Sequence, residues 1–406
     1  MNPARSRLEA AAPGIALDPG RTGHRAETLV TDLCSLIVGQ DEAIQQIVNI
    51  YQMYLTGMAA PGRPVGNFLF LGPTGSGKTR IVEATAQSLL GNAHAVVKVD
   101  CAEFQHSHEI AKLVGSPPGY LGHRETQPLL CQETLDQHHS EKVKLSFVLF
   151  DEIEKASDAV WNLLLGILDK ATLRLGDNRK VDFSRSMIFM TSNLGASEMS
   201  SILTPPMGFT AVAAPASNRT GEIDGKLNEK ISACGHQAAR RKFTPEFINR
   251  IDKIVVFKPL GEPQLRSILD IELRMVQERV LTDCGTPFGF VLTGAAKSHL
   301  LREGTDVRYG ARHLKRAIER LLIQPISNLI ASEQVGSGDW VRVDFDSDLN
   351  AMRFLKEAQG MPVESMAQKA WTSGVAPLAA QAISASPEAH PSRIRQTPPG
   401  EVTFGE

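Results

Sequence analysis

The sequence "FLFLGPTGSGKT" (residues 68–79) decides how this chain folds. Its first four residues are apolar, as in a buried strand, and "KTRIVEATAQSLL" (78–90) continues with helical spacing. Residues 72–79, "GPTGSGKT", satisfy G-x-x-x-x-G-K-[ST], a pattern that requires this order of strand, loop and helix. Its glycines let backbone N–H groups surround phosphate oxygens at a helix N-terminus. The sequence therefore predicts a nucleotide-binding loop formed by Gly72, Pro73, Thr74, Gly75, Ser76, Gly77, Lys78 and Thr79.

Two later apolar runs also end in polar residues. "SFVLFDE" (146–152) ends in Asp151 and Glu152, and "SMIFMTSN" (186–193) ends in Asn193. Because strand ends in such sheets open onto the ligand crevice, these side chains are candidates for the same site as Lys78. We expect Thr79 to bind Mg²⁺ directly and Asp151 to hold it through water, while Glu152 polarises the attacking water and Asn193 orients it.

The order of the elements predicts the architecture. Apolar runs of strand length at residues 65–72, 94–100, 146–152 and 186–193 alternate with helical or irregular stretches. This alternation favours an α/β fold with a mostly parallel sheet flanked by helices. Helical spacing then dominates, with one short strand candidate, "WVRVDF" (340–345). We predict a disordered arm over 1–26, a large α/β nucleotide-binding subdomain over 27–258, a smaller, mainly helical subdomain over 259–347, and a disordered tail rich in Ala, Pro and Ser over 348–406.

Composition disfavours several classes of protein. A net charge of -2 over 406 residues provides no broad attraction for nucleic acid. The five cysteines stand singly, which favours neither a disulfide framework nor a zinc site and suits a reducing cytoplasm. No apolar run approaches the roughly 18 residues that a membrane span needs. These features predict a soluble cytoplasmic protein that binds no membrane.

Seven segments together resemble one AAA+ module of the Clp ATPases, closest to the C-terminal ATPase ring of the ClpA, ClpB and ClpC proteins. The resemblance extends from Leu33 to Phe345 and implies a P-loop AAA+ large subdomain with a smaller helical one. The segments, in family order, are "IVGQDEAI", "GPTGSGKT", "VGSPPGYLG", "VLFDEIEKA", "VDFSRSMIFMTSNLGAS", "FTPEFINRID" and "YGARHLKRAIER".

The resemblance implies roles that residue spacing does not. It places Ile37 and Val38 against adenine, Arg250 as an arginine finger reaching a neighbouring subunit, and Arg312 as the sensor arginine of the small subdomain. A finger supplied in trans requires a partner subunit, so a homo-oligomeric, hexameric ring is implied. The implied cofactors are ATP and Mg²⁺.

Two loops have implied roles in handling protein. Gly119, Tyr120, Leu121 and Gly122 match the family's pore loop, whose aromatic ring grips a threaded chain. Met207, Gly208 and Phe209 resemble the loop that docks a ClpP-like peptidase. The chain departs from the family in residues 123–146, which are longer than usual, and in 168–183, which lack the usual pore-loop stretch.

These observations predict an ATP-hydrolysing ring motor that unfolds or remodels protein substrates by threading them through a central pore. Feeding of a ClpP-like peptidase is an alternative. A remodeller of nucleic-acid complexes is another, but no interleaved basic and aromatic stripe supports it. A third is a regulatory ATPase whose nucleotide state controls partner binding.

Overall fold

A computed structural model describes residues 18–116, 128–203, 225–305 and 310–372. The chain forms two compact units. The first contains the residues up to 271 together with 298–323, and the second contains 272–297 and the residues from 324 onward. The predicted subdomain bounds, 27–258 and 259–347, stay a prediction.

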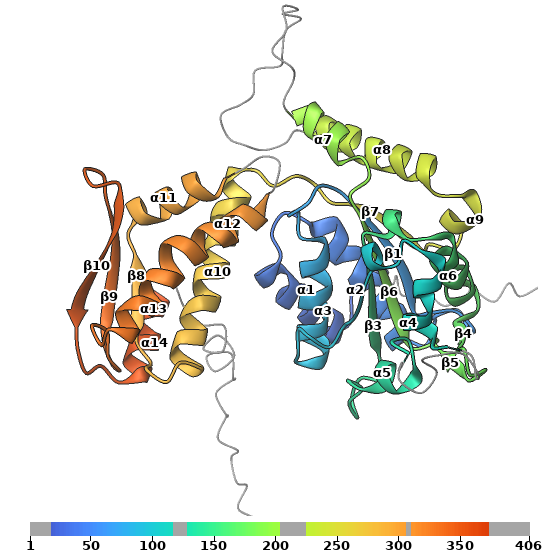
Figure 1. The fold of residues 1–406 in the computed structure, drawn as a ribbon, viewed down its shortest axis with the longest axis horizontal. Coiled ribbons are helices and arrows are strands. Elements are labelled where there is room, and N and C mark those ends of the chain that lie inside the picture. Colours follow the sequence, from blue (N-terminus) through green and yellow to red (C-terminus); the bar gives the residue numbers. More distant parts are fainter. Residues whose placement is uncertain (1–17, 117–127, 204–224, 306–309, 373–406) are drawn as a thin grey trace, which may run out of the picture. The chain divides into compact units, whose positions relative to one another are not determined.

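A five-stranded parallel sheet is the centre of the first unit (Figure 1). Its spatial order is β2-β3-β6-β1-β7, and every neighbouring pair is parallel. Because the chain crosses from one strand to the next through helices, the carboxyl ends of all five strands meet at one edge. The strands are β1 (Gly66–Leu71), β2 (Val97–Asp100), β3 (Ser146–Asp151), β6 (Ser186–Ser192) and β7 (Lys253–Val256).

Both faces of this sheet are buried, which explains why its strands are continuous apolar runs. Alternate residues point to opposite faces. Phe68 and Phe189 stack on one face, with ring centroids 5.0 Å apart, while Leu69 and Ile188 belong to the core on the other face. Figure 1 shows helices on the two sides. They are α1 (His24–Leu36), α2 (Asp41–Leu55) and α3 (Lys78–Leu90) on the side of Phe68, and α6 (Asp158–Lys170) and α8 (Gly225–Lys242) on the other.

Shorter elements complete the unit. The hairpin β4 (Thr172–Arg174) and β5 (Lys180–Asp182) is antiparallel and occupies the predicted second pore-loop region. The remaining α-helices of the unit are α4 (Ala111–Val114), α5 (Gln132–Asp136), α7 (Ala196–Leu203), α9 (Pro245–Ile248) and α12 (Ala311–Ile318).

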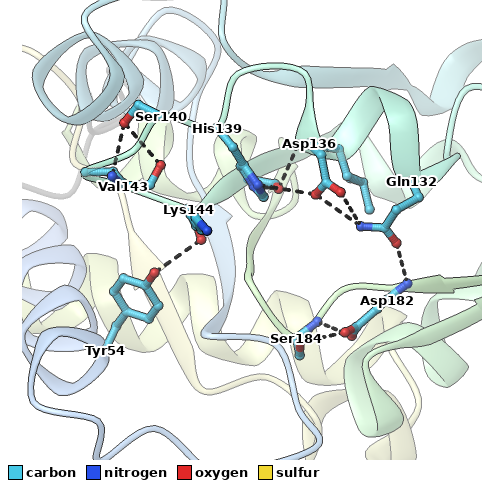
Figure 2. Close-up of polar contacts among 11 residues, drawn as sticks. Tyr54, Gln132, Asp136, His139, Ser140, Val143, Lys144, Asp182 and Ser184 are labelled. Atoms are coloured by element: carbon cyan, nitrogen blue, oxygen red, sulfur yellow. Dashed lines mark hydrogen bonds and ion pairs between the residues drawn. The ribbon is translucent and has the colours of Figure 1, made fainter.

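Part of the segment that departs from the family is held by side-chain contacts (Figure 2). His139 Nε2 lies 2.8 Å from Ser146 Oγ, and its Nδ1 lies 3.3 Å from an Asp136 carboxylate oxygen. Gln132 accepts a hydrogen bond from the backbone N–H of Asp182 (2.9 Å). These contacts join α5 and the loop after it to β3 and β5, so hydrogen bonds hold this part of the segment next to both strands.

The second unit contains a three-stranded sheet, of which the sequence pattern predicts only one strand. The order is β10-β9-β8, with β10 antiparallel and β8 parallel to β9. Its elements are β8 (Gly289–Leu292), α13 (Gln324–Ala331), β9 (Trp340–Asp346), β10 (Ala351–Ala358) and α14 (Val363–Thr372). Helices α10 (Glu262–Thr282) and α11 (Gly294–Gly304) contribute residues to both units.

The predicted disorder after residue 348 is wrong for residues 351–372. Strand β10 pairs with β9 along its length. In α14, Met366 and Ala370 are fully buried in a cluster with Trp340. Trp340 itself is only 1% exposed. This apolar burial offsets the cost of ordering the segment. Residues 373–406 lie outside the described part.

At the N-terminus, α1 begins at His24, within the predicted arm. The Gly23 carbonyl accepts hydrogen bonds from the backbone N–H groups of Ala26 and Glu27, and Ala26 is fully buried. The arm prediction is therefore wrong from residue 24 onward. Within the ranges that the structure describes, no helix has the length and apolar character to cross a membrane.

Candidate functional site

Residues 72–77 form the turn between β1 and α3. Gly72, Gly75 and Gly77 have φ angles of 145°, 76° and 103°, values that only glycine adopts readily. Gly77 is the N-cap of α3, and an added Cβ there would meet no atom within 4 Å. Gly77 therefore leaves open space at the N-terminus of a helix, where an anion is favoured.

Lys78 is the first residue of α3 and is 8% exposed. Its Nζ donates to the carbonyls of Gly72 (2.7 Å) and Pro73 (2.9 Å) and to Asn193 Oδ1 (2.9 Å). Burial lowers the pKa of Lys78 to about 8, although the nearby carboxylates of Asp151, Glu154 and Glu152 oppose the shift. The side chain thus remains largely an ammonium at neutral pH.

The carboxyl end of β3 carries the two predicted acids. The carboxylate of Asp151 accepts a hydrogen bond from the Thr191 hydroxyl of β6. Glu152 has a φ of 54°, in the left-handed region that non-glycine residues rarely adopt. Its N–H donates to Thr191 Oγ1 (3.1 Å), and its carboxylate forms an ion pair with Lys155. Such a backbone conformation costs about 1–3 kcal/mol and is typical of functional sites.

Asn193 joins the two halves of the candidate site. Its Oδ1 accepts from Lys78 Nζ, and its Nδ2 donates to Glu152 Oε1 (3.3 Å). Thr74 Oγ1 lies 3.4 Å from the same Oδ1. The structure therefore brings the loop after β1, the acids after β3 and the amide after β6 into one network.

The segment before α2 contains a site residue that sequence reasoning missed. Ile37 is buried, Val38 is half-buried and Gln40 is 4% exposed. Gln40 Nε2 donates to the carbonyls of Ser76 (3.2 Å) and Lys258 (2.9 Å), and its Oε1 accepts from the Lys258 N–H (3.1 Å). Gln40 thus attaches the candidate phosphate loop to the segment after β7. The only sequence signal was that Gln40 belongs to "IVGQDEAI", one of the segments that resemble the Clp ATPases.

Replacing Gln40 with Ala is expected to lower the free energy of unfolding by about 2 kcal/mol, because it leaves buried backbone groups without partners. Chemical denaturation measures this change. Gln45→Ala is the matched control, since Gln45 is exposed on α2 and its side chain donates only to Asn49 among the hydrogen bonds of the described residues. The control should change stability by less than about 0.5 kcal/mol. Equal effects of the two variants would contradict the assigned role of Gln40.

Arg250 lies after α9 and contacts its own chain. Its guanidinium donates to the Leu165 carbonyl of α6 (2.7 Å) and to Glu246 (2.9 Å). Its backbone carbonyl accepts from Asn67 Nδ2 (3.1 Å) and from Arg63 (3.3 Å). No hydrogen bond or ion pair within the described residues joins Arg250 to Lys78, Glu152 or Asn193. The structure does not bring it into the same-chain network.

Arg312 is an exposed residue at the start of α12. The N–H of its neighbour Ala311 donates to the Gly75 carbonyl (3.2 Å), within the first unit. Gly310 has a φ of 52°, and an added Cβ would lie 2.9 Å from Gly75 O, so the close approach favours glycine. The positive charge of Arg312 contributes to the lowered pKa of Lys78. Arg312 is therefore close enough to the candidate phosphate loop to act on it electrostatically.

Two family models match adjacent parts of the chain. Residues 63–254 match the AAA domain (Cdc48 subfamily), and residues 260–343 match the C-terminal, D2-small domain of ClpB protein. Residues 63–343 form a Clp-type AAA+ module. The first match contains the network of Lys78, Glu152 and Asn193, and the second contains Arg312.

Curated relatives resemble this Clp-type module at moderate identity. Chaperone protein ClpB of Bdellovibrio bacteriovorus is 38% identical over 310 residues, which are 76% of this chain and 32% of the relative. The ATP-binding subunit ClpC of the Clp protease of Staphylococcus saprophyticus is 35% identical over 325 residues, or 79% of this chain and 37% of the relative. The chain thus spans about a third of the length of these relatives.

Solved structures of Hsp104 share the fold of the module. One, a closed state with ATPγS and casein, has a TM-score of 0.65 at 30% identity and covers 82% of this chain and 52% of that one. Another, an extended complex of Saccharomyces cerevisiae Hsp104 with casein, has a TM-score of 0.67 at 29% identity. It covers 81% of this chain and 52% of that one.

Two predicted loops of the Clp-type module fall outside the described residues. Gly119, Tyr120, Leu121 and Gly122 belong to residues 117–127, and Met207, Gly208 and Phe209 belong to 204–224. Their assignments remain predictions from sequence.

Proposed function

We propose that this chain is an ATP-hydrolysing motor of the Clp type that unfolds or remodels proteins by threading them through a ring. The observation that carries the proposal is the contact network in which Asn193 bridges Lys78 and Glu152. A phosphate-loop ammonium, a carboxylate and an orienting amide are the parts that attack by water on a γ-phosphate requires.

The residues present fit a bound magnesium nucleotide. Open space at Gly77 leaves room for phosphate at the start of α3, and we propose that Lys78 exchanges its bonds to the loop carbonyls for bonds to phosphate oxygens. Ile37 and Val38 would contact adenine. Thr79 and Asp151 supply hydroxyl and carboxylate oxygens, the ligand types that Mg²⁺ prefers, with Asp151 acting through water. Magnesium, when bound, would neutralise charge on the phosphates.

Glu152 is the proposed general base. The contact of its Oε1 with Asn193 and the ion pair of its Oε2 with Lys155 hold the carboxylate beside the phosphate loop. From there it would accept a proton from water, while the Asn193 amide orients the same water. Both groups come from strand ends of a rigid sheet, which limits their motion relative to Lys78.

We propose that Arg250 acts at the nucleotide site of the neighbouring subunit and that Arg312 acts at the site of its own subunit. Among the described residues, no hydrogen bond or ion pair joins Arg250 to the Lys78 network of its own chain, as expected of a side chain that acts in trans. A ring of identical subunits, most simply a hexamer as the resemblance implies, would place it at the neighbour's γ-phosphate. Arg312 would report nucleotide state to the small subdomain.

We propose that the aromatic ring of Tyr120 contacts the threaded protein substrate. Replacing it with Ala is expected to spare ATP turnover and to impair ATP-dependent unfolding, because the ring contacts the threaded chain and not the nucleotide. Unfolding is measured by loss of fluorescence from a tagged fluorescent protein. Tyr120→Phe is the matched control and should unfold nearly as well as the wild type, since it keeps the aromatic ring. Normal unfolding by the Ala variant would remove Tyr120 from the mechanism.

An assay of ATP turnover separates the alternatives. Stimulation of ATP turnover by unfolded protein supports the motor, stimulation by DNA supports a nucleic-acid remodeller, and stimulation by neither supports a regulatory ATPase. Degradation that appears only when a ClpP-like peptidase is added would establish the peptidase-feeding alternative.

We also propose a cytoplasmic location, because all five cysteines are free thiols, as in a reducing compartment.

A further inference from the structure

Glu154 contacts the candidate site from the turn that follows β3. It belongs to the short 3₁₀ helix η3 (Ile153–Lys155), which is anchored by the fully buried side chain of Ile153. Glu154 Oε1 accepts a hydrogen bond from the backbone N–H of Asn193 (3.1 Å). Its Oε2 is shielded from solvent and has no hydrogen-bond partner within the described ranges. Within the described ranges, the bond from the Asn193 N–H is therefore the one hydrogen bond that the Glu154 carboxylate accepts.

The Asn193 carbonyl accepts a hydrogen bond from the Ala196 N–H (3.2 Å), whereas its N–H donates to Glu154. β6 ends at Ser192, so Asn193 lies just beyond the ladder that holds the strand. Its side chain must still reach Lys78 Nζ (2.9 Å) and Glu152 Oε1 (3.3 Å) at the same time. Because a short amide side chain has few rotamers, its reach to both groups depends on where its backbone lies.

We propose that Glu154 is a positioning residue for ATP hydrolysis, which holds the Asn193 backbone so that its amide bridges Lys78 and Glu152. This inference rests on the proposed function. Because a misplacement of about 1 Å in a reacting group can cost on the order of 100-fold in rate, loss of this hydrogen bond should reduce turnover. ATP binding, which depends on the loop and Lys78, should change little.

The test compares three variants of the full chain. Glu154→Ala removes the acceptor, and Glu154→Asp retracts it by one methylene, so both should lower kcat by about 30- to 100-fold with little change in KM. Glu154→Gln keeps an oxygen acceptor but removes the charge, and should restore turnover to within about threefold of wild type. Glu103→Ala removes an exposed carboxylate from the neighbouring turn (Cys101–Glu103) and serves as the control.

Hydrogen exchange at the Asn193 amide provides a second readout that does not depend on turnover. Exchange should be at least about 10-fold faster in Glu154→Ala than in wild type or Glu154→Gln, because only the Ala variant loses the side-chain oxygen that accepts from this N–H. Equal exchange in wild type, Glu154→Ala and Glu154→Gln would overturn the inference. Equal turnover in wild type and Glu154→Ala would also overturn it. So would equal losses in the Ala and Gln variants, which would assign the effect to charge. A wild-type chain that does not hydrolyse ATP would refute the proposed function instead, and the exchange measurement would still decide the role of Glu154.

Discussion

Glu152→Gln is expected to lower steady-state ATP turnover by at least about 100-fold while ATP still binds, since general-base catalysis contributes about 10²–10⁴ in rate. An amide cannot accept the proton of the attacking water. The Gln side chain can still accept from Asn193 Nδ2, so the network around Lys78 should persist. Loss of the ion pair with Lys155 should matter little, because both side chains are partly exposed. Turnover is measured by phosphate release, and binding is measured by titration with a fluorescent ATP analogue.

Glu103→Gln is the control for this substitution, since Glu103 is exposed and lies outside the candidate site. It should leave both measurements unchanged. Undiminished hydrolysis by Glu152→Gln would show that another group activates water. Failure of that variant to bind nucleotide would instead indicate that Glu152 supports the loop rather than the chemistry.

Arg250→Ala is expected to reduce ATP turnover by about 10³- to 10⁵-fold, the range for arginine fingers that act in trans. The guanidinium would stabilise negative charge that develops on the γ-phosphate in the neighbouring subunit. In the single chain its hydrogen bonds go to the Leu165 carbonyl and Glu246, so the variant also loses local contacts. Glu246→Ala removes one of these partners without removing the finger, and should lower turnover by less than about threefold.

Mixing two inactive variants tests the trans arrangement directly. A ring that contains Glu152→Gln and Arg250→Ala subunits includes interfaces with an intact base on one side and an intact finger on the other. ATP turnover in the mixture should therefore exceed that of either variant alone. No recovery despite verified co-assembly, or only a twofold loss in Arg250→Ala, would show that Arg250 is not a trans catalytic group.

Local sequence patterns predicted the elements that build the site. A uniformly apolar run needs burial on both faces, and the glycines at 72, 75 and 77 adopt backbone angles that other residues avoid. Because these requirements act over a few residues, the loop after β1 and the acids after β3 were predictable. The alternation of strands with helices was sufficient to predict a parallel sheet.

The segment after residue 348 shows where composition misleads. Averaged over 348–406, its Ala, Pro and Ser content predicts disorder, yet β10 and α14 form within it. Their stability comes from pairing with β9 and from the apolar cluster around Trp340. Both β9 and Trp340 lie outside the window from which disorder was predicted.

The sequence by itself determined a candidate phosphate loop, an acidic strand end, an amide strand end and their order, because each depends on short-range backbone and burial preferences. Only the tertiary structure decided that Asn193 bridges Lys78 and Glu152, that Gln40 attaches the loop to Lys258, and that Glu154 holds the Asn193 backbone. The contacts made by Asn193 and Gln40 join residues far apart in the sequence. Their distances depend on how parallel strands align at one edge of the sheet, which no local pattern encodes.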